Sequence, residues 1–170
     1  LKHRTYLEGA QKQIAHLKSI ARVHGRETRI WIHVYVVCRE TEKEAKDYLN
    51  YSVYEKRDWE GAGNLLKIFG MQTETLDNKT LDSHKAHFIA GHGGYPLVGT
   101  AEQIVDELGK LADIGADGCL ISWVDYVSEC RQWIDKVLPL TEQAGLGDPF
   151  APAQQAKARR AHVDSAAMAQ

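Results

Sequence analysis

The first part of the chain carries apolar residues at every third or fourth position. Gln, Lys and Arg lie between them, and the clearest apolar positions are Leu7, Ile14, Leu17 and Ala21. This period predicts an amphipathic helix over residues 5–24. Gly25 follows directly, and glycine is typical of the position that closes a helix.

Residues 29–38 predict a strand, because β-branched and aromatic residues run here without Gly or Pro. The two faces of this strand differ in character. One face carries only aliphatic side chains, which suits packing beneath helices. The other face carries Trp31, His33, Tyr35 and Val37. Either this second face lines a polar site, or His33 and Tyr35 are core residues with satisfied hydrogen bonds.

A glycine-rich segment, residues 91–100, follows an apolar run that predicts a strand at residues 87–90. Its four glycines indicate a sharp turn or a close approach of another group to the backbone. Thr100 and Gln103 have the spacing of a capping box, so a helix is expected to begin there. Thr41 and Glu44, after the strand at residues 29–38, have the same spacing and predict another helix start. In α/β proteins a loop between strand and helix lies where ligands bind. A plain tight turn is the alternative interpretation.

The remaining stretches are less regular. About residues 52–85 we expect short helices, which form either a lid over a site or a plain surface insertion. A helix is predicted at residues 101–113 and a short buried strand at residues 119–123. Ser128 is expected to cap a last helix. Residues 147–170 lack a hydrophobic pattern and predict a tail that is either disordered or docked on a partner.

Helical and strand patterns therefore alternate, which predicts an α/β fold with a parallel sheet or a β/α barrel. Only three strands are predicted in 170 residues, whereas a complete eight-stranded barrel takes about 250 residues. Three parallel strands alone would leave two open edges. We therefore predict that residues 1–146 form the second half of a barrel.

Composition limits the class of protein further. A formal net charge of -2 argues against a nucleic-acid-binding protein. No apolar run approaches the roughly 20 residues that span a bilayer. Three cysteines without CxxC spacing, and no visible signal peptide, predict reduced thiols in the cytoplasm. The eight histidines include no HExxH or similar spacing, so we predict no metal site.

Several short segments of the chain follow one order of motifs. They are residues 36–45, 94–105, 111–118, 121–123 and 137–140. Together they resemble the C-terminal half of the luciferase-like family of flavin-dependent monooxygenases. That half typically has a VGTPE turn, a helix, an aGxDg turn, a short strand and a vlPxL helix. Ala101 replaces the usual proline here. The most similar subgroup includes the alkanesulfonate, dimethyl sulfone and pyrimidine monooxygenases.

The resemblance implies a (β/α)8 barrel of the bacterial-luciferase type, with its strands six, seven and eight at residues 30–38, 85–90 and 119–123. It implies that reduced FMN, supplied by a separate NAD(P)H reductase, binds at the carboxyl ends of the strands. Most FMN phosphate contacts would come from the missing N-terminal half of the barrel, which is then an expected partner. This chain alone is expected to be inactive. Family members are often dimers or tetramers, so a homo-oligomer is also expected.

The resemblance further implies site residues. His33 and Tyr35 match strand positions at which alkanesulfonate monooxygenases present an Arg and a His, and His92 falls near an Arg of a mobile loop. These three are the expected catalytic residues, and the loss of Arg argues against a sulfonate substrate. Asp125 is expected to bind substrate. The expected cofactor-binding residues are Gly93, Gly94, Tyr95 and Trp123.

The predicted function is that of a reduced-FMN-dependent monooxygenase. It would insert oxygen from O2 into a small sulfur- or nitrogen-containing organic compound. Two alternatives stay open. One is an F420-dependent oxidoreductase of the same fold, which would transfer hydride without consuming O2. The other is a non-catalytic half-barrel with a binding or structural role.

Overall fold

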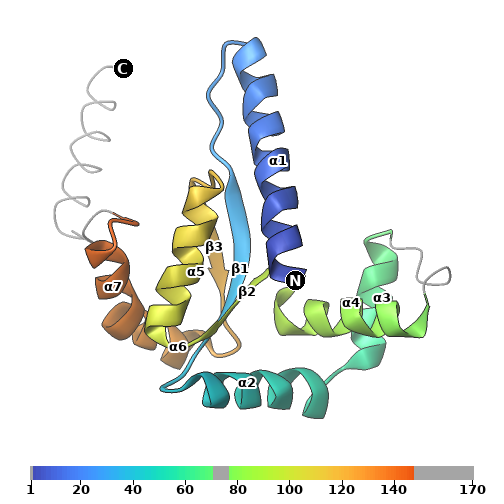
Figure 1. The fold of residues 1–170 in the computed structure, drawn as a ribbon. Helices are drawn as coiled ribbons and strands as arrows, with labels where there is room; N and C mark the ends of the chain where they lie inside the picture. Colours follow the sequence, from blue (N-terminus) through green and yellow to red (C-terminus); the bar gives the residue numbers. More distant parts are fainter. Residues whose placement is uncertain (1, 71–76, 148–170) are drawn as a thin grey trace, which may run out of the picture.

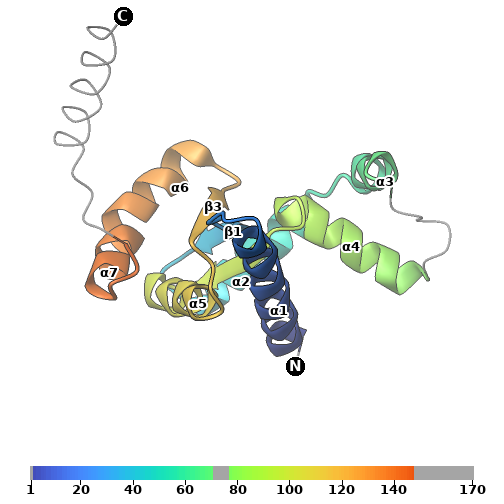
Figure 2. The same ribbon diagram turned by 90° about the horizontal axis from the view of Figure 1, so that it is seen from above.

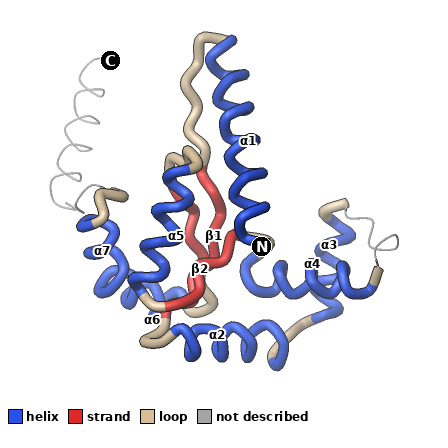
Figure 3. The backbone as a smooth tube through the Cα atoms, viewed as in Figure 1, coloured by secondary structure: helices blue, strands red, loops and turns tan. Residues whose placement is uncertain are grey.

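The computed structural model describes residues 2–70 and 77–147 (Figure 1). The strands lie at the centre of the molecule, with helices around them (Figure 3). Residues 148–170, most of the predicted tail, lie outside the described residues. The elements are α1 (Lys2–Val23), β1 (Trp31–Cys38), α2 (Glu42–Asn50), the π-helical turn η1 (Tyr51–Glu55), α3 (Trp59–Ile68), α4 (Asn78–Gly91), β2 (Tyr95–Gly99), α5 (Ala101–Asp113), β3 (Gly118–Ser122), α6 (Tyr126–Gln132), the π-helical turn η3 (Trp133–Val137) and α7 (Leu138–Gln143).

The three described strands form one parallel sheet in the order β2-β1-β3. The last five residues of β1 pair with β2, and its first five pair with β3. The central strand is therefore the long apolar strand that the sequence predicts. Its neighbours β2 and β3 are the edge strands of the described sheet, and α5 connects them.

The strand predicted at residues 85–90 is wrong. These residues belong to α4, which Asp77 caps at its start by accepting a hydrogen bond from the Thr80 N–H at 3.0 Å. The strand is instead β2, which lies inside the segment predicted as a glycine-rich loop. The implied strand numbering fails as well, because β2 pairs on the outer side of β1 and does not lie between β1 and β3. A short apolar run does not by itself distinguish a helix from a strand.

The hydrophobic core lies between one face of the sheet and helices α1, α5, η3 and α7. Val34 and Val36 of β1 and Leu97 of β2 are at most 2% exposed there. Figures 1 and 2 place α5 to α7 on one side of the sheet and α3 and α4 on the other. The residues of β1 that alternate with the core positions therefore point away from α5 and α7.

Two helix starts follow the predicted capping chemistry. At α5, the Thr100 hydroxyl accepts from the Gln103 N–H, and the Gln103 side chain accepts from the Thr100 N–H at 3.0 Å. At α2, Thr41 and Glu44 form the same reciprocal pair. Each box satisfies two backbone donors that a helix start otherwise leaves unpaired. Both capping boxes are confirmed.

Asp117 ties α1 to the start of β3 and gives the fold a pH dependence. Its Oδ2 lies 2.7 Å from Nζ of Lys18 and accepts from the Ile30 N–H at 2.8 Å. The hydrogen bond from Lys18, then that from Ile30, lowers the pKa of Asp117 below its usual 3.8. Because the folded state favours the charged carboxylate, its contribution is present above the usual pKa and is lost as the pH falls through the lowered one.

We expect Asp117→Asn to weaken the loss of stability in acid. The midpoint of urea unfolding, measured at pH 7 and at pH 3, should fall further for the wild type than for Asp117→Asn, because the variant has no carboxylate to protonate. Equal falls in the two proteins would show that Asp117 is not responsible for the acid dependence.

Candidate functional site

The face of the sheet opposite the core carries the residues first predicted for a site. We call this the inner face and define it as Trp31, His33 and Tyr35 of β1 with Leu120 and Ser122 of β3. Register places His33 beside Leu120 and Tyr35 beside Ser122, so all five share one side of the sheet. Trp31 is 60% exposed and Leu120 63%, whereas Tyr35 is 5% exposed beneath α4. The inner face is thus open at its amino end and covered towards its carboxyl end.

His33 lies where all three strands approach one another. Its Nε2 is 3.1 Å from Oγ of Ser122, which also lies 3.2 Å from the carbonyl oxygen of Val34. Gly94, just before β2, lies against the other side of the ring. A Cβ at Gly94 would come within 3.1 Å of Nδ1 of His33. The structure therefore brings together the predicted residues His33 and Gly94, and adds Ser122, which the sequence analysis missed.

Tyr35 packs tightly against α4. Its ring centroid is 6.2 Å from that of His87, at 80°. A Cβ at Gly91 would lie only 2.4 to 2.7 Å from side-chain atoms of Tyr35, so the helix touches the ring through its bare backbone. Burial, and then the nearby Tyr54, raise the pKa of Tyr35 to about 12. At neutral pH the phenol therefore keeps its proton and is a hydrogen-bond donor.

Gly91→Ala should separate α4 from β1. The added methyl group overlaps Tyr35, so we expect a loss of about 2 kcal/mol in the free energy of unfolding. Gly109→Ala in α5 is the matched control, because nothing lies within 4 Å of a Cβ there. That control should gain about 0.5–1 kcal/mol from better helix propensity. Urea titration measures both, and a Gly91→Ala variant as stable as the wild type would contradict the close approach.

His92 and Gly93 form the turn after α4 and do not join the inner face. His92 closes the helix in the left-handed region, with φ of 51°, and its ring contacts Phe88 at 5.2 Å. Both residues line a groove of about 360 Å³ between α3 and α4, which also contains Leu66, Phe69, His84, His87 and Phe88. Burial, and then the nearby His84, lower the pKa of His87. The groove therefore favours the neutral form of His87.

Tyr95 and Trp123, predicted to bind cofactor, lie on the helix-facing side of the sheet. Tyr95 is 2% exposed, and its hydroxyl donates to Oε2 of Glu107 in α5 at 2.7 Å. The Trp123 ring packs edge-on against Trp133 and Tyr126, at centroid distances of 6.1 and 5.5 Å. These contacts give both side chains a packing role and place them away from the inner face, because the strand alternates sides at each residue.

Asp125, predicted to bind substrate, caps α6 in this structure. Its carboxylate accepts from the Ser128 hydroxyl at 2.6 Å and from the Val127 N–H at 3.0 Å. The hydrogen bond from Ser128, then that from Val127, lowers the pKa of Asp125. The carboxylate is therefore charged near neutral pH and already engaged with the helix start.

A buried ion pair holds the loop that contains Asp125. Oε1 of Glu129 lies 2.9 Å from a guanidinium nitrogen of Arg39, the residue after β1. Oε2 of Glu129 accepts from the N–H groups of Val124 and Asp125, at 3.0 and 2.9 Å. The guanidinium lies 3.8 Å from the ring centroid of Tyr48. The carboxyl ends of β1 and β3 are thereby fixed to each other, although nothing in the sequence pattern marks Glu129 as buried.

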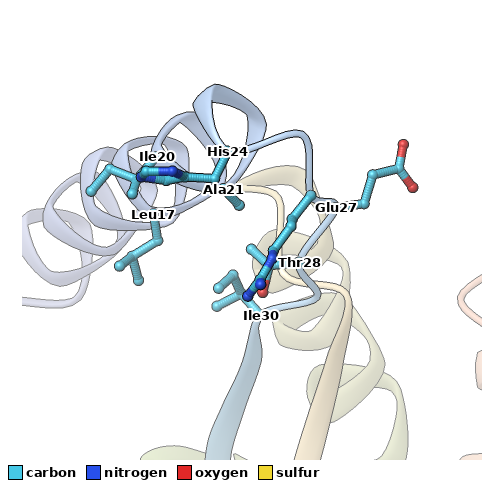
Figure 4. Close-up of a pocket in the computed structure, with 8 residues that line it drawn as sticks. Leu17, Ile20, Ala21, His24, Glu27, Thr28 and Ile30 are labelled. Atoms are coloured by element: carbon cyan, nitrogen blue, oxygen red, sulfur yellow. The ribbon is translucent and has the colours of Figure 1, made fainter.

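A larger hollow, about 760 Å³, lies at the opposite end of β1 (Figure 4). It is formed by the end of α1 and the connection to β1, and its lining includes Leu17, Ile20, His24, Glu27, Thr28 and Ile30. In β/α barrels ligands bind at the carboxyl ends of the strands. This hollow lies at the amino end, so we do not assign the site to it.

The comparison with protein families decides the class of this molecule. A model of the luciferase-like monooxygenases matches residues 4–118. The chain belongs to the luciferase-like monooxygenase family. The recognition made from short motifs is thereby confirmed.

A curated relative and two solved structures extend this result. The chain is 26% identical over 142 residues to an FMNH(2)-dependent dimethylsulfone monooxygenase of Pseudomonas putida, covering 81% of this chain and 39% of the relative. Its fold resembles that of DmoA from Hyphomicrobium sulfonivorans, with a TM-score of 0.72, 19% identity and coverage of 86% and 37% of the two chains. It also resembles the fold of a riboflavin lyase, RcaE, with a TM-score of 0.70 and 20% identity. The match covers 86% of this chain and 39% of RcaE.

These matches confirm the predicted fold class, an α/β chain that forms part of a luciferase-like TIM barrel. The chain spans about two fifths of the length of the curated relative. Every helix in the described ranges is too short or too polar to cross a lipid bilayer. Within the same ranges, no three His, Cys, Asp or Glu side chains form a group that could hold a metal ion. The absence of a metal site therefore stays a prediction.

Proposed function

We propose that this chain is part of a reduced-FMN-dependent monooxygenase that inserts oxygen from O2 into a small sulfur- or nitrogen-containing organic compound. The family match over residues 4–118 carries this proposal. It is supported by the relative from Pseudomonas putida, which is named an FMNH(2)-dependent dimethylsulfone monooxygenase. A site on the inner face is a separate proposal, and it rests on the geometry around His33.

The inner face fits the ring part of a flavin better than its phosphate. Towards the carboxyl ends of the strands this face presents the His33 ring and the Ser122 hydroxyl, with Gly94 beside them. The inner face as we define it contains no Arg or Lys, and Arg39 beyond β1 is engaged by Glu129. We therefore propose that groups outside the described residues hold the phosphate, as expected if further strands complete the barrel.

Bound reduced FMN supplies the electrons with which O2 is activated. The residues of this chain bind and orient the flavin and the substrate, and they exclude water from the site. Tyr35 is almost fully buried beneath α4 and bounds the covered end of the inner face. His33 offers a ring nitrogen to bound ligand. We propose that α3 and α4 cover the carboxyl end of the site, the role of a lid.

The active unit needs more than this chain. The described edge strands β2 and β3 leave unpaired backbone groups. We propose that additional barrel strands pair with them, that a separate reductase supplies reduced FMN, and that the complete enzyme is a homo-oligomer. The three free cysteines favour a reducing, cytoplasmic compartment.

The first test uses the complete enzyme with FMN that has been reduced by light, without a reductase. Dimethyl sulfone is the probe substrate, and its loss is followed by NMR. We expect loss of the sulfone only when the enzyme, reduced FMN and O2 are all present. Turnover with reduced F420 under nitrogen would instead support the hydride-transfer alternative, and failure of the complete enzyme to bind FMN would support a non-catalytic role.

A further inference from the structure

Three polar groups form a chain of hydrogen bonds across the inner face. The Val34 carbonyl oxygen lies 3.2 Å from Oγ of Ser122, and the same Oγ lies 3.1 Å from Nε2 of His33. Ser122 and His33 come from different strands, β3 and β1. The pairing of these strands therefore fixes the contact, and neither side chain reaches it through a flexible loop.

The single hydroxyl proton of Ser122 decides which nitrogen of His33 carries a proton. If Ser122 donates to Val34, its oxygen is free to accept, and Nε2 of His33 must be the donor. If Ser122 donated to Nε2 instead, Nδ1 would carry the proton. Among the described residues no acceptor is bonded to Nδ1, and the bond from Ser122 to Val34 would be lost. The first arrangement satisfies more groups, which is the accepted ground for assigning a tautomer.

Gly94 lies against the side of the ring that carries Nδ1 and Cε1. A Cβ at this position would lie 3.1 Å from Nδ1 and 3.2 Å from Cε1 of His33. Any side chain would therefore press on the Nδ1 side of the imidazole, whereas glycine does not. With its proton on Nε2, the ring is engaged by Ser122 through that nitrogen, and Nδ1 keeps a lone pair to which no described residue donates.

We propose that Ser122 is a positioning residue, which holds His33 with its proton on Nε2 and presents Nδ1 as a hydrogen-bond acceptor to the ligand. The role of that ligand rests on the function proposed above, but the tautomer does not. A lone pair at Nδ1 matches a ligand group that donates N–H or O–H. It repels an anionic group, so the site selects against an anion at this point.

The test reads the tautomer directly on this chain, labelled with ¹⁵N-histidine, by long-range ¹H–¹⁵N NMR at pH 8. The His33 signals are assigned by their loss in His33→Gln. In the wild type we expect an unprotonated Nδ1 and a protonated Nε2 whose hydrogen exchanges slowly. Ser122→Ala should lose the slow exchange and show both tautomers. Ser122→Thr, which keeps the hydroxyl on a β-branched side chain suited to a strand, should restore the wild-type pattern.

Two results would overturn the proposal. One is a protonated Nδ1 in the wild type, which would make the site a donor towards its ligand. The other is a His33 spectrum that Ser122→Ala leaves unchanged. Neither result depends on turnover or on flavin binding, so the inference can fail while the monooxygenase proposal stands, and the reverse also holds.

Discussion

Glu129→Ala is expected to lower the free energy of unfolding by about 3 kcal/mol, since it leaves the charge of Arg39 without its buried partner. The Glu129 side chain is 7% exposed and that of Arg39 is 23%, so water replaces little of what is lost. The N–H groups of Val124 and Asp125 lose their acceptor at the same time. Urea unfolding followed by circular dichroism measures the change.

Two further variants separate the causes. Glu129→Gln keeps an oxygen that accepts from the two N–H groups but removes the charge, so its loss should be smaller than that of Glu129→Ala. Asp47→Ala is the control, because it removes the partner of Lys43 in an ion pair whose two side chains are each more than 60% exposed. It should leave the midpoint of urea unfolding unchanged. If Glu129→Ala and Asp47→Ala behaved alike, the buried pair would not hold β1 to α6.

The variant His33→Ala is expected to have the second large effect, a loss of catalytic activity. In the complete enzyme we expect kcat/KM for the probe substrate to fall about 100-fold, because the ligand loses the ring that orients it. The half-buried ring stands on the central strand between β2 and β3, so its removal vacates the place where the three strands meet. Loss of dimethyl sulfone with reduced FMN and O2 measures the effect.

His16→Ala is the matched control, because His16 lies exposed on α1. It should retain wild-type activity. Circular dichroism must show that His33→Ala is folded before its kinetics are compared. A folded His33→Ala variant with wild-type kcat/KM would move the site away from the inner face and towards the groove that contains His92.

Much of the fold follows from the sequence because its strongest signals are local. The period of apolar residues gave α1, and Gly25 indeed closes that helix with φ of 64°. The apolar run gave β1. The two capping boxes are decided by residues three positions apart, which explains why both were predicted correctly.

The errors arise where tertiary contacts decide. Residues 85–90 are apolar enough for a strand, yet they lie in α4, whose Gly91 packs on Tyr35. The glycines after it read as a loop, but β2 gains its strand structure only by pairing with β1. Neither contact is visible in a short window of sequence.

The residues of the candidate site also divide into those that the sequence predicts and those that only tertiary contacts reveal. Alternation along one strand placed His33 and Tyr35 on a common face, which the structure retains. Ser122 could not be added, because its place beside Tyr35 depends on the register between β1 and β3. Trp123 was one residue away from that face and therefore points to the helices, where it meets Trp133.

We propose that the enzyme containing this chain inserts oxygen from O2 by means of reduced FMN. The most direct measurement is mass spectrometry of the product formed from dimethyl sulfone under ¹⁸O2, with light-reduced FMN. We predict one ¹⁸O atom in each molecule of oxygenated product and no product under nitrogen. Product that carries no ¹⁸O, or that forms equally well without O2, would contradict the account.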